Sequence, residues 1–249
     1  MSVLVAIVLG IVQGVTEFLP VSSSGHLILF EKLFGLSGDN LAFNIVVHFG
    51  TLFAVVICYR QRLFEMLKKP LSKPVMLLAL SCVPTVVIYE LFRDFFSEAF
   101  SGVYLGICFF VTAVFLSIGD FFKDKTKGEI DYKSALVMGA FQGFAILPGV
   151  SRSGSTLVAG LVSGADKEKV ADFSFLMSLP VIVGSLILEI FSGGFESIEF
   201  LPLLFGFVFS FISGYVAIKF MLKIVKNKSF LPFVIYLLVV GVFCFFVWV

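Results

Sequence analysis

The run Pro148-Gly149-Val150-Ser151-Arg152-Ser153-Gly154-Ser155-Thr156 decides how the rest of the chain can fold. It places one arginine, four hydroxyl side chains and two glycines within a long apolar region. Placing an arginine side chain at membrane depth costs free energy, so an arginine found there indicates a functional site. Gly149 and Gly154 let a ligand approach the backbone, and the hydroxyls with nearby N–H groups can donate to an anion. We therefore predict a phosphate-binding loop, the alternative being a surface loop whose arginine reaches lipid headgroups.

The composition around this run is that of an integral membrane protein. The 249 residues are 59% hydrophobic and 14% charged, with a mean hydropathy of +1.08. Soluble domains have about 45–50% apolar and about 25% charged residues. The net charge of +1 argues neither for nor against nucleic acid, and no nucleic-acid partner is expected. The four cysteines stand singly in apolar runs, which predicts neither a disulfide nor a zinc site.

Apolar windows long enough to cross a bilayer occur six times. They lie near 41–59, 75–92, 102–122, 170–191, 200–221 and 230–249. Two further apolar segments, 1–36 and 134–165, are interrupted near the middle by Pro, Gly and Ser. Irregular backbone at membrane depth is tolerated only where protein buries it or a cavity is lined, so we predict two re-entrant helical hairpins.

The two interrupted segments also resemble each other. At a constant offset of 129 residues, six identities recur: Gly10, Gln13, Gly14, Ser22, Ser24 and Gly25 match Gly139, Gln142, Gly143, Ser151, Ser153 and Gly154. Each half of the chain then has one hairpin and three spanning helices. Because three crossings end on the opposite side of the membrane, the second half begins there and has the inverted topology. We predict an all-α integral membrane fold of two inverted-topology repeats, about 1–122 and about 123–249, in a single membrane domain 1–249.

Lysine and arginine are distributed unevenly over the predicted loops. Fifteen lie on one side, against two, Lys32 and Arg93, on the other, with Arg152 inside. Short cytoplasmic loops carry the excess of Lys and Arg, so the basic side is predicted to be cytoplasmic. Both termini and the mouth of the first hairpin then face the outer side.

Gln13 and Glu17 are candidate metal ligands in the first hairpin. Their i, i+4 spacing places both side chains on one helix face. Their oxygens suit a divalent cation such as Mg²⁺ or Ca²⁺ that bridges to phosphate, with substrate and water completing the ligand set. The alternative is a capping or interhelical hydrogen-bond pair.

The run Ser22-Ser23-Ser24-Gly25-His26 follows in the same hairpin. Each serine is a candidate nucleophile or hydrogen-bond donor, although capping of the next half-helix is the commoner role of serine. His26 could act as a general base. His48 is either a packed helix residue or a supporting partner of the site.

The tips of the two hairpins are expected to meet near the bilayer midplane. Two half-helix N-termini would then point at one spot, each offering free N–H groups and a positive dipole end. Arg152 adds a guanidinium that can bind phosphate through two nitrogens. This arrangement predicts a site for a diphosphate, surrounded by lipid.

Two long motifs also resemble a known family. The run Gln13-Gly14-Val15-Thr16-Glu17-Phe18-Leu19-Pro20-Val21-Ser22-Ser23-Ser24-Gly25-His26 and the opening run are similar to the two signatures of the bacterial undecaprenyl-diphosphate phosphatases, also called bacitracin-resistance proteins. The resemblance covers essentially the whole chain, because two further segments are also similar: Val47-His48-Phe49-Gly50-Thr51-Leu52 and 173–180.

This resemblance implies hydrolysis of undecaprenyl diphosphate to undecaprenyl phosphate and inorganic phosphate, which recycles the carrier for peptidoglycan synthesis and confers bacitracin resistance. It implies a divalent cation and a location in the bacterial cytoplasmic membrane. The partners are a polyprenyl diphosphate and membrane lipids, and a homodimer is a candidate assembly. Matched to the motifs, the implied catalytic residues are Glu17, Ser22, Ser23, His26 and Arg152, and the phosphate-binding residues are Ser151, Arg152, Ser153, Gly154 and Thr156. Gln13 stands where many relatives have Glu.

Two other functions use similar sequence features. Type-2 phosphatidic-acid phosphatases need a second catalytic histidine after their SR motif, and this chain has none after His48. A transporter or flippase of a phosphorylated polyprenyl lipid would also use inverted repeats and a midplane anion site. The nature of the nucleophile, whether serine, His26 or water, stays open.

Overall fold

The computed structural model describes residues 1–36, 40–192, 199–227 and 229–248. These residues form helices and no named strand; the one β-bridge joins Gly128 and Ala165. The helices within the described ranges are α1 (Val3–Phe18), α2 (Ser23–Leu33), α3 (Leu41–Cys58), α4 (Arg60–Lys68), α5 (Lys73–Leu91), α6 (Arg93–Ala99), α7 (Leu105–Phe122), α8 (Tyr132–Phe144), α9 (Arg152–Val162), α10 (Lys167–Ser192), α11 (Phe200–Asn227) and α12 (Leu231–Val247).

Five helices are long and apolar enough to cross a membrane: α3, α5, α7, α10 and α11. They confirm five of the six predicted spanning windows. The sixth, α12, is an apolar helix of 17 residues, at the short end of the range that can span a bilayer core. The all-helical class predicted from the sequence is confirmed.

Both interrupted segments break where the sequence predicts. α1 ends at Phe18, two residues before Pro20, and α2 begins at Ser23 with Ser22 as its N-cap. α8 ends at Phe144, before Pro148, and α9 begins at Arg152 with Ser151 as its N-cap. α2 and α9 have 11 residues each and are only about 16 Å long, roughly half the thickness of a bilayer core.

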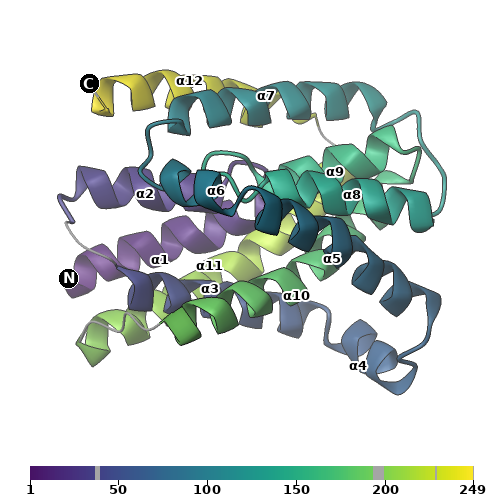
Figure 1. Ribbon diagram of the computed structural model, residues 1–249, viewed down its shortest axis with the longest axis horizontal. Helices are drawn as coiled ribbons and strands as arrows, with labels where there is room; N and C mark the ends of the chain where they lie inside the picture. Colours follow the sequence, from purple (N-terminus) through teal and green to yellow (C-terminus); the bar gives the residue numbers. More distant parts are fainter. Residues whose placement is uncertain (37–39, 193–198, 228, 249) are drawn as a thin grey trace.

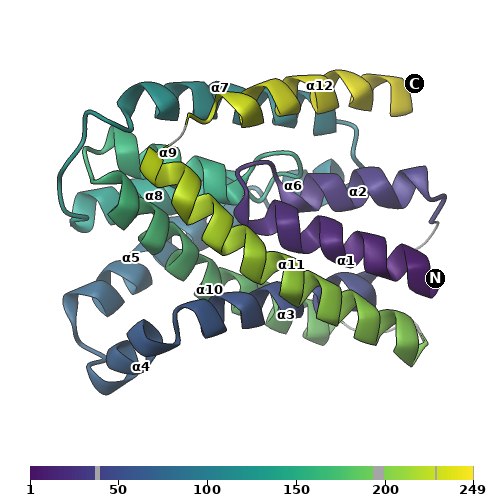
Figure 2. The ribbon, with the colours of Figure 1, turned by 180° about the vertical axis from the view of Figure 1, so that it is seen from behind.

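The helices lie broadly along one direction, and the two broken segments meet in the middle (Figures 1 and 2). In Figure 1, α1 and α2 extend from the tips toward the left, where both termini lie, whereas α8 and α9 extend toward the right. α1 packs along α11 and α8 packs along α5, while α7 packs against α12 and α3 against α10. Helices that correspond in the two halves of the chain thus have corresponding neighbours.

Glycines at matching positions permit this close packing. A Cβ on Gly10 would lie 2.7 Å from the Gly206 carbonyl oxygen, and one on Gly14 would lie 2.7 Å from the Gly214 nitrogen, both on α11. On α8, a Cβ on Gly139 would overlap the Ser81 carbonyl oxygen of α5. Small residues at four-residue spacing let helix backbones approach closely, which is a common device in membrane helices.

Two short helices, α4 and α6, were not predicted from the sequence. Both lie in connections assigned as loops, and α4 has no buried residue. The connections after α3, α7, α9 and α11 lie at the end opposite the termini, and most of the basic residues stand in these connections or in the helix ends beside them (Figures 1 and 2). Ion pairs at this end include Lys167–Asp124 at 2.7 Å and Lys226–Glu168 at 2.9 Å.

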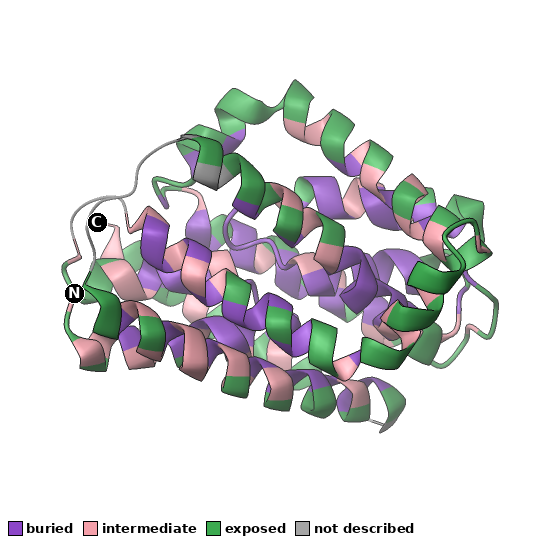
Figure 3. Ribbon diagram, turned by 90° about the horizontal axis from the view of Figure 1, so that it is seen from below, coloured by how far each residue is buried: buried purple, intermediate pink, exposed green. Residues whose placement is uncertain are grey.

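Burial is greatest along the middle of the molecule, and the outward faces are exposed (Figure 3). Many exposed residues are large and apolar, among them Leu91, Phe121, Phe200 and Val239. Exposed apolar surface of this extent is unusual in a protein surrounded by water. It is the surface expected of a chain whose outer faces contact lipid.

Candidate active site

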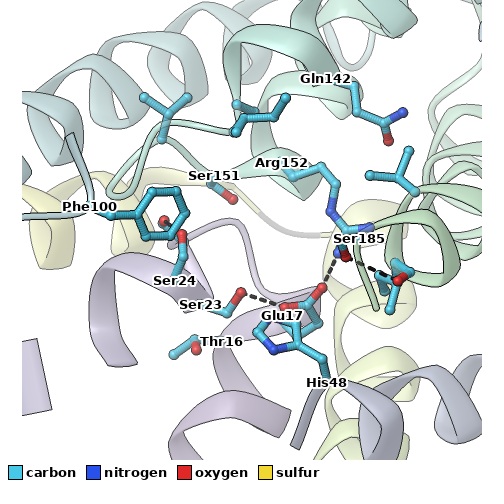
Figure 4. A pocket seen from close by; sticks show the side chains of 16 residues that line it. Thr16, Glu17, Ser23, Ser24, His48, Phe100, Gln142, Ser151, Arg152 and Ser185 are labelled. Carbon is cyan, nitrogen blue, oxygen red and sulfur yellow. Dashed lines mark hydrogen bonds and ion pairs between the residues drawn. The ribbon is translucent and has the colours of Figure 1, made fainter. Parts of the chain in front are cut away.

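A cavity of about 200 Å³ lies where the two broken segments meet. Its lining includes the polar residues Thr16, Glu17, Ser22, Ser23, Ser24, His48, Gln142, Ser151, Arg152 and Ser185 (Figure 4). Phe100 and apolar residues such as Ile146 and Ile182 complete the wall. The sequence predicts that both motifs share one site, and the cavity contains residues of both.

Glu17 is the centre of the polar contacts. Its side chain is only 3% exposed. Oε2 accepts a hydrogen bond from Gln13 Nε2 at 2.9 Å and another from Ser23 Oγ. Oε1 forms an ion pair with Arg152 Nη2. Figure 4 shows Ser23 and Arg152 reaching the same carboxylate from the two sides of the cavity.

The first residues of α2 and α9 therefore converge on one group. Ser23 opens α2 and Arg152 opens α9, and both contact Glu17. The free N–H groups and positive dipole ends of two helices point into the same region. Arg152 Nη1 is buried and has no hydrogen-bond partner among the described residues. This second nitrogen is available to an anionic ligand.

The two tips hold each other in place. Ser22 Oγ accepts a hydrogen bond from Gly149 N at 3.0 Å, and Ser153 Oγ donates to the Leu19 carbonyl oxygen at 3.0 Å. A Cβ on Gly25 would lie 2.8 Å from Gly149 N. Contacts of this kind fix the positions of Ser23 and Arg152 relative to Glu17 without any ligand.

Thr112 of α7 secures the second tip. Its Oγ1 donates to the Gly149 carbonyl oxygen at 2.8 Å and accepts from Ser151 N at 3.0 Å. Gly149 has φ of +92°, a conformation that glycine adopts without strain. This requirement explains the glycine that follows Pro148.

Only part of the predicted phosphate-binding loop faces the cavity. Ser151 and Arg152 line it. Ser151 Oγ accepts from Gly154 N at 3.1 Å, so this N–H is already used. Ser153 bonds to the first tip, and Thr156 Oγ1 lies 2.6 Å from Ser174 Oγ on α10. In this structure Ser153, Gly154 and Thr156 support the loop.

His26 does not line the cavity. Nδ1 lies 2.7 Å from the Ser22 carbonyl oxygen, and Nε2 lies 2.7 Å from Tyr236 Oη on α12. Because a carbonyl oxygen can only accept, Nδ1 carries the proton, and Nε2 accepts from the tyrosine hydroxyl. Ser22, whose carbonyl is held in this way, has φ of +71°, unusual for a residue with a side chain.

The cavity also contains residues other than the predicted catalytic and phosphate-binding ones. For His48 the sequence left a packing role and a supporting role open. His48 lines the wall, and its Nδ1 lies 2.8 Å from the Asn44 carbonyl oxygen, which fixes the ring. Gln142 is buried and donates to Thr85 Oγ1 at 3.2 Å, and its Oε1 has no hydrogen-bond partner in the described part of the chain. Its match to Gln13 at the repeat offset was the signal that could have identified it. No sequence signal marked Phe100 or Ser185.

The predicted cation ligands lie together. Gln13 Oε1 is buried and has no hydrogen-bond partner among the described residues, next to the Glu17 carboxylate. A carboxylate has about four lone-pair sites, and three contacts to Glu17 are present. Oxygen atoms suit Mg²⁺ or Ca²⁺. Within the described ranges no cluster of three or more His, Cys, Asp or Glu residues occurs, so protein ligands for a cation are sparse. The donor chemistry nevertheless fits one.

Known proteins match nearly the full length of the chain. The sequence profile of the family described as "Bacitracin resistance protein BacA" matches residues 6–243. Undecaprenyl-diphosphatase 4 of Bacillus thuringiensis subsp. konkukian is 42% identical over 248 residues, covering 97% of this chain and 96% of that protein. The undecaprenyl-diphosphatases of Carboxydothermus hydrogenoformans and Halothermothrix orenii are 40% and 39% identical, and each covers at least 94% of both chains.

Proposed function

The chain belongs to the family of the bacitracin resistance protein BacA, and on this premise we propose that it hydrolyses undecaprenyl diphosphate to undecaprenyl phosphate and inorganic phosphate. The reaction would return the lipid carrier to peptidoglycan synthesis and oppose bacitracin. One observation supports the chemistry most directly: a carboxylate, a serine hydroxyl and a guanidinium meet in one cavity, and one guanidinium nitrogen has no partner among the residues that the structure describes.

Arg152 is the residue proposed to bind the terminal phosphate. Nη1 has no partner among the described residues and could donate to a phosphate oxygen while Nη2 stays on Glu17. The N-termini of α2 and α9 would stabilise the negative charge that develops on the phosphoryl oxygens.

Ser23 and Glu17 are proposed as nucleophile and base. A hydroxyl that donates to a carboxylate is the arrangement in which the carboxylate takes the proton as the oxygen attacks. Attack by Ser23 Oγ on the terminal phosphorus would form one P–O bond and break the bond to the bridging oxygen, releasing undecaprenyl phosphate. Water would then cleave the phosphoserine and free inorganic phosphate.

His26 is proposed to position the first tip and not to act as the base. Its ring bonds to the Ser22 carbonyl oxygen and to Tyr236, so neither nitrogen is left for substrate. A divalent cation held by Gln13 and Glu17 would neutralise phosphate charge and polarise the phosphoryl group.

We also propose that the chain consists of two inverted repeats in the bacterial cytoplasmic membrane. The matched glycines, the corresponding helix neighbours and the opposite directions of the two broken segments all support this topology. The basic turns would face the cytoplasm and the first hairpin the outer side.

The test is phosphate release from undecaprenyl diphosphate by purified protein in detergent, with Mg²⁺, with Ca²⁺ and with EDTA. Wild type should release phosphate, and EDTA should stop it. Arg152→Lys keeps the charge but cannot contact Glu17 and phosphate through two nitrogens, so kcat should fall about 10²–10³-fold. Arg62→Lys is the matched control, because Arg62 forms an exposed pair with Asp172 at 3.2 Å. A wild type that binds the lipid but frees no phosphate with cation present would instead indicate a carrier.

A further inference from the structure

A second cavity, an open apolar groove of about 470 Å³, lies among α3, α4, α5 and α10. All of its lining residues are apolar; among them are Leu52, Val56, Met66, Leu78, Leu179 and Val183. Val56 and Val183 are 40% and 41% exposed, so the groove opens to the side of the molecule. Its volume is in the range of small-molecule binding sites.

The groove lies next to the catalytic cavity on the same two helices. On α3, His48 lines the catalytic cavity, and Leu52, one turn along the same face, lines the groove. On α10, Ile182 lines the cavity and Leu179 lines the groove. Leu52 and Ile182 belong to one hydrophobic cluster, against which Leu179 packs. Apolar side chains of this cluster therefore connect the two cavities.

A polyprenyl diphosphate bound at Arg152 needs a route for its chain. The diphosphate site is buried among the helix tips, and its wall is mostly polar toward α1, α2 and α9. On α10, Val181 and Ile182 give the cavity an apolar wall, and Ile182 belongs to the same hydrophobic cluster as Leu52, which lines the groove. Burying a hydrocarbon chain there is favourable, whereas burying it against the polar tips would leave hydroxyl and amide groups unpaired.

We propose that the groove among α3, α4, α5 and α10 binds the isoprene units that follow the first one of the polyprenyl chain, while the diphosphate occupies the catalytic cavity. This inference depends on the proposed substrate class. The groove would then favour long prenyl chains over short ones, and α4, whose Met66 and Leu67 line it, would cover its far end.

The experiment combines crosslinking with a comparison of substrates. A photoreactive benzophenone analogue of undecaprenyl diphosphate should label α3, α4 or α10 at the groove, and Val183→Trp, which fills the groove, should abolish that labelling. The same variant should raise KM for undecaprenyl diphosphate about tenfold, which corresponds to losing on the order of 60 Å² of apolar contact. The rate with dimethylallyl diphosphate, which has one isoprene unit, should change less than twofold.

Two further variants guard against a general folding defect. Val56→Trp blocks the groove from α3 and should have the same chain-dependent effect. Val216→Trp on α11 is the control, because Val216 is 59% exposed and lines neither cavity. Labelling that persists in Val183→Trp, labelling only by a phospholipid probe, or an equal loss with both substrates would overturn the proposal. Groove labelling without phosphate release in wild type would overturn the proposed hydrolysis and leave the groove assignment in place.

Discussion

The buried pair between Glu17 and Arg152 leads to a prediction about stability. Arg152→Ala would leave the Glu17 carboxylate, 3% exposed, with only Ser23 and Gln13 as partners. Removing one member of a buried ion pair costs about 3–5 kcal/mol, because the other charge stays desolvated. For a chain of this length about 1 kcal/mol shifts Tm by about 2–4 °C, so Tm should fall by about 10 °C.

The second substitution identifies the cause. Adding Glu17→Gln to Arg152→Ala removes the unpaired charge and leaves a neutral amide that can still bond to Ser23. The double variant should therefore recover most of the lost Tm, although it stays inactive. Arg62→Ala is the control: the Arg62 and Asp172 side chains are 43% and 36% exposed, and such a pair contributes about 0–1 kcal/mol.

Unfolding can be followed with a thiol-reactive dye in detergent. Cys108 and Cys244 are 6% and 2% exposed, so they react only when the helices separate. The reasoning is refuted if Arg152→Ala is as stable as Arg62→Ala, or if the double variant melts no higher than the single one. Either result would mean that the Glu17 charge is not desolvated in the folded protein.

Two further predictions concern packing and the His26 contact. Gly14→Ala should lower the free energy of unfolding by about 1–3 kcal/mol, and Tm with it, because the added Cβ meets the backbone of α11. Gly184→Ala is the control: no atom lies within 4 Å of the added Cβ, so this variant should be neutral or slightly stabilising. Equal Tm values for the two variants would contradict the packing argument. Tyr236→Phe removes the hydroxyl that donates to His26 Nε2 and should lower kcat several-fold, with little change in KM and no change in the acidic limb of the pH–rate profile. A shift of that acidic limb would show that His26 acts as the base, because a base must be deprotonated to work.

The broken segments were predictable because their signals are local. Pro20 and Pro148 end helices, and Ser22 and Ser151 cap the helices that follow, so four residues locate both breaks. The shared spacing of the glycines gave the pairing of the halves. The helix breaks depend on the chain within a few residues, and the correspondence of the halves depends on an offset of 129 residues that can be read directly from the sequence.

The sequence did not predict which distant residue each side chain of the site would contact. His26 stands three residues after Ser23, yet Ser23 faces Glu17 while His26 faces Tyr236, 210 positions away. Which neighbour a helix face meets depends on packing among distant helices. Phe100 enters the cavity wall from the end of a short helix that no periodicity indicated. Contacts of this type require the assembled structure.

The matched positions also explain why both halves of the chain are needed for one site. Glu17 corresponds to Ile146 at the repeat offset, and Ser23 corresponds to Arg152, and all four line the cavity. The first half contributes the carboxylate of Glu17 and the hydroxyl of Ser23. The second half contributes the guanidinium of Arg152, and it has the apolar Ile146 at the position that matches Glu17. A symmetric pair of carboxylates would repel each other in a buried site, whereas this exchange gives one acid with its counter-ion. Ile146→Glu should therefore bring a second carboxylate to the cavity that Arg152 cannot also neutralise, and phosphate release should fall even though Glu17 and Arg152 are both retained.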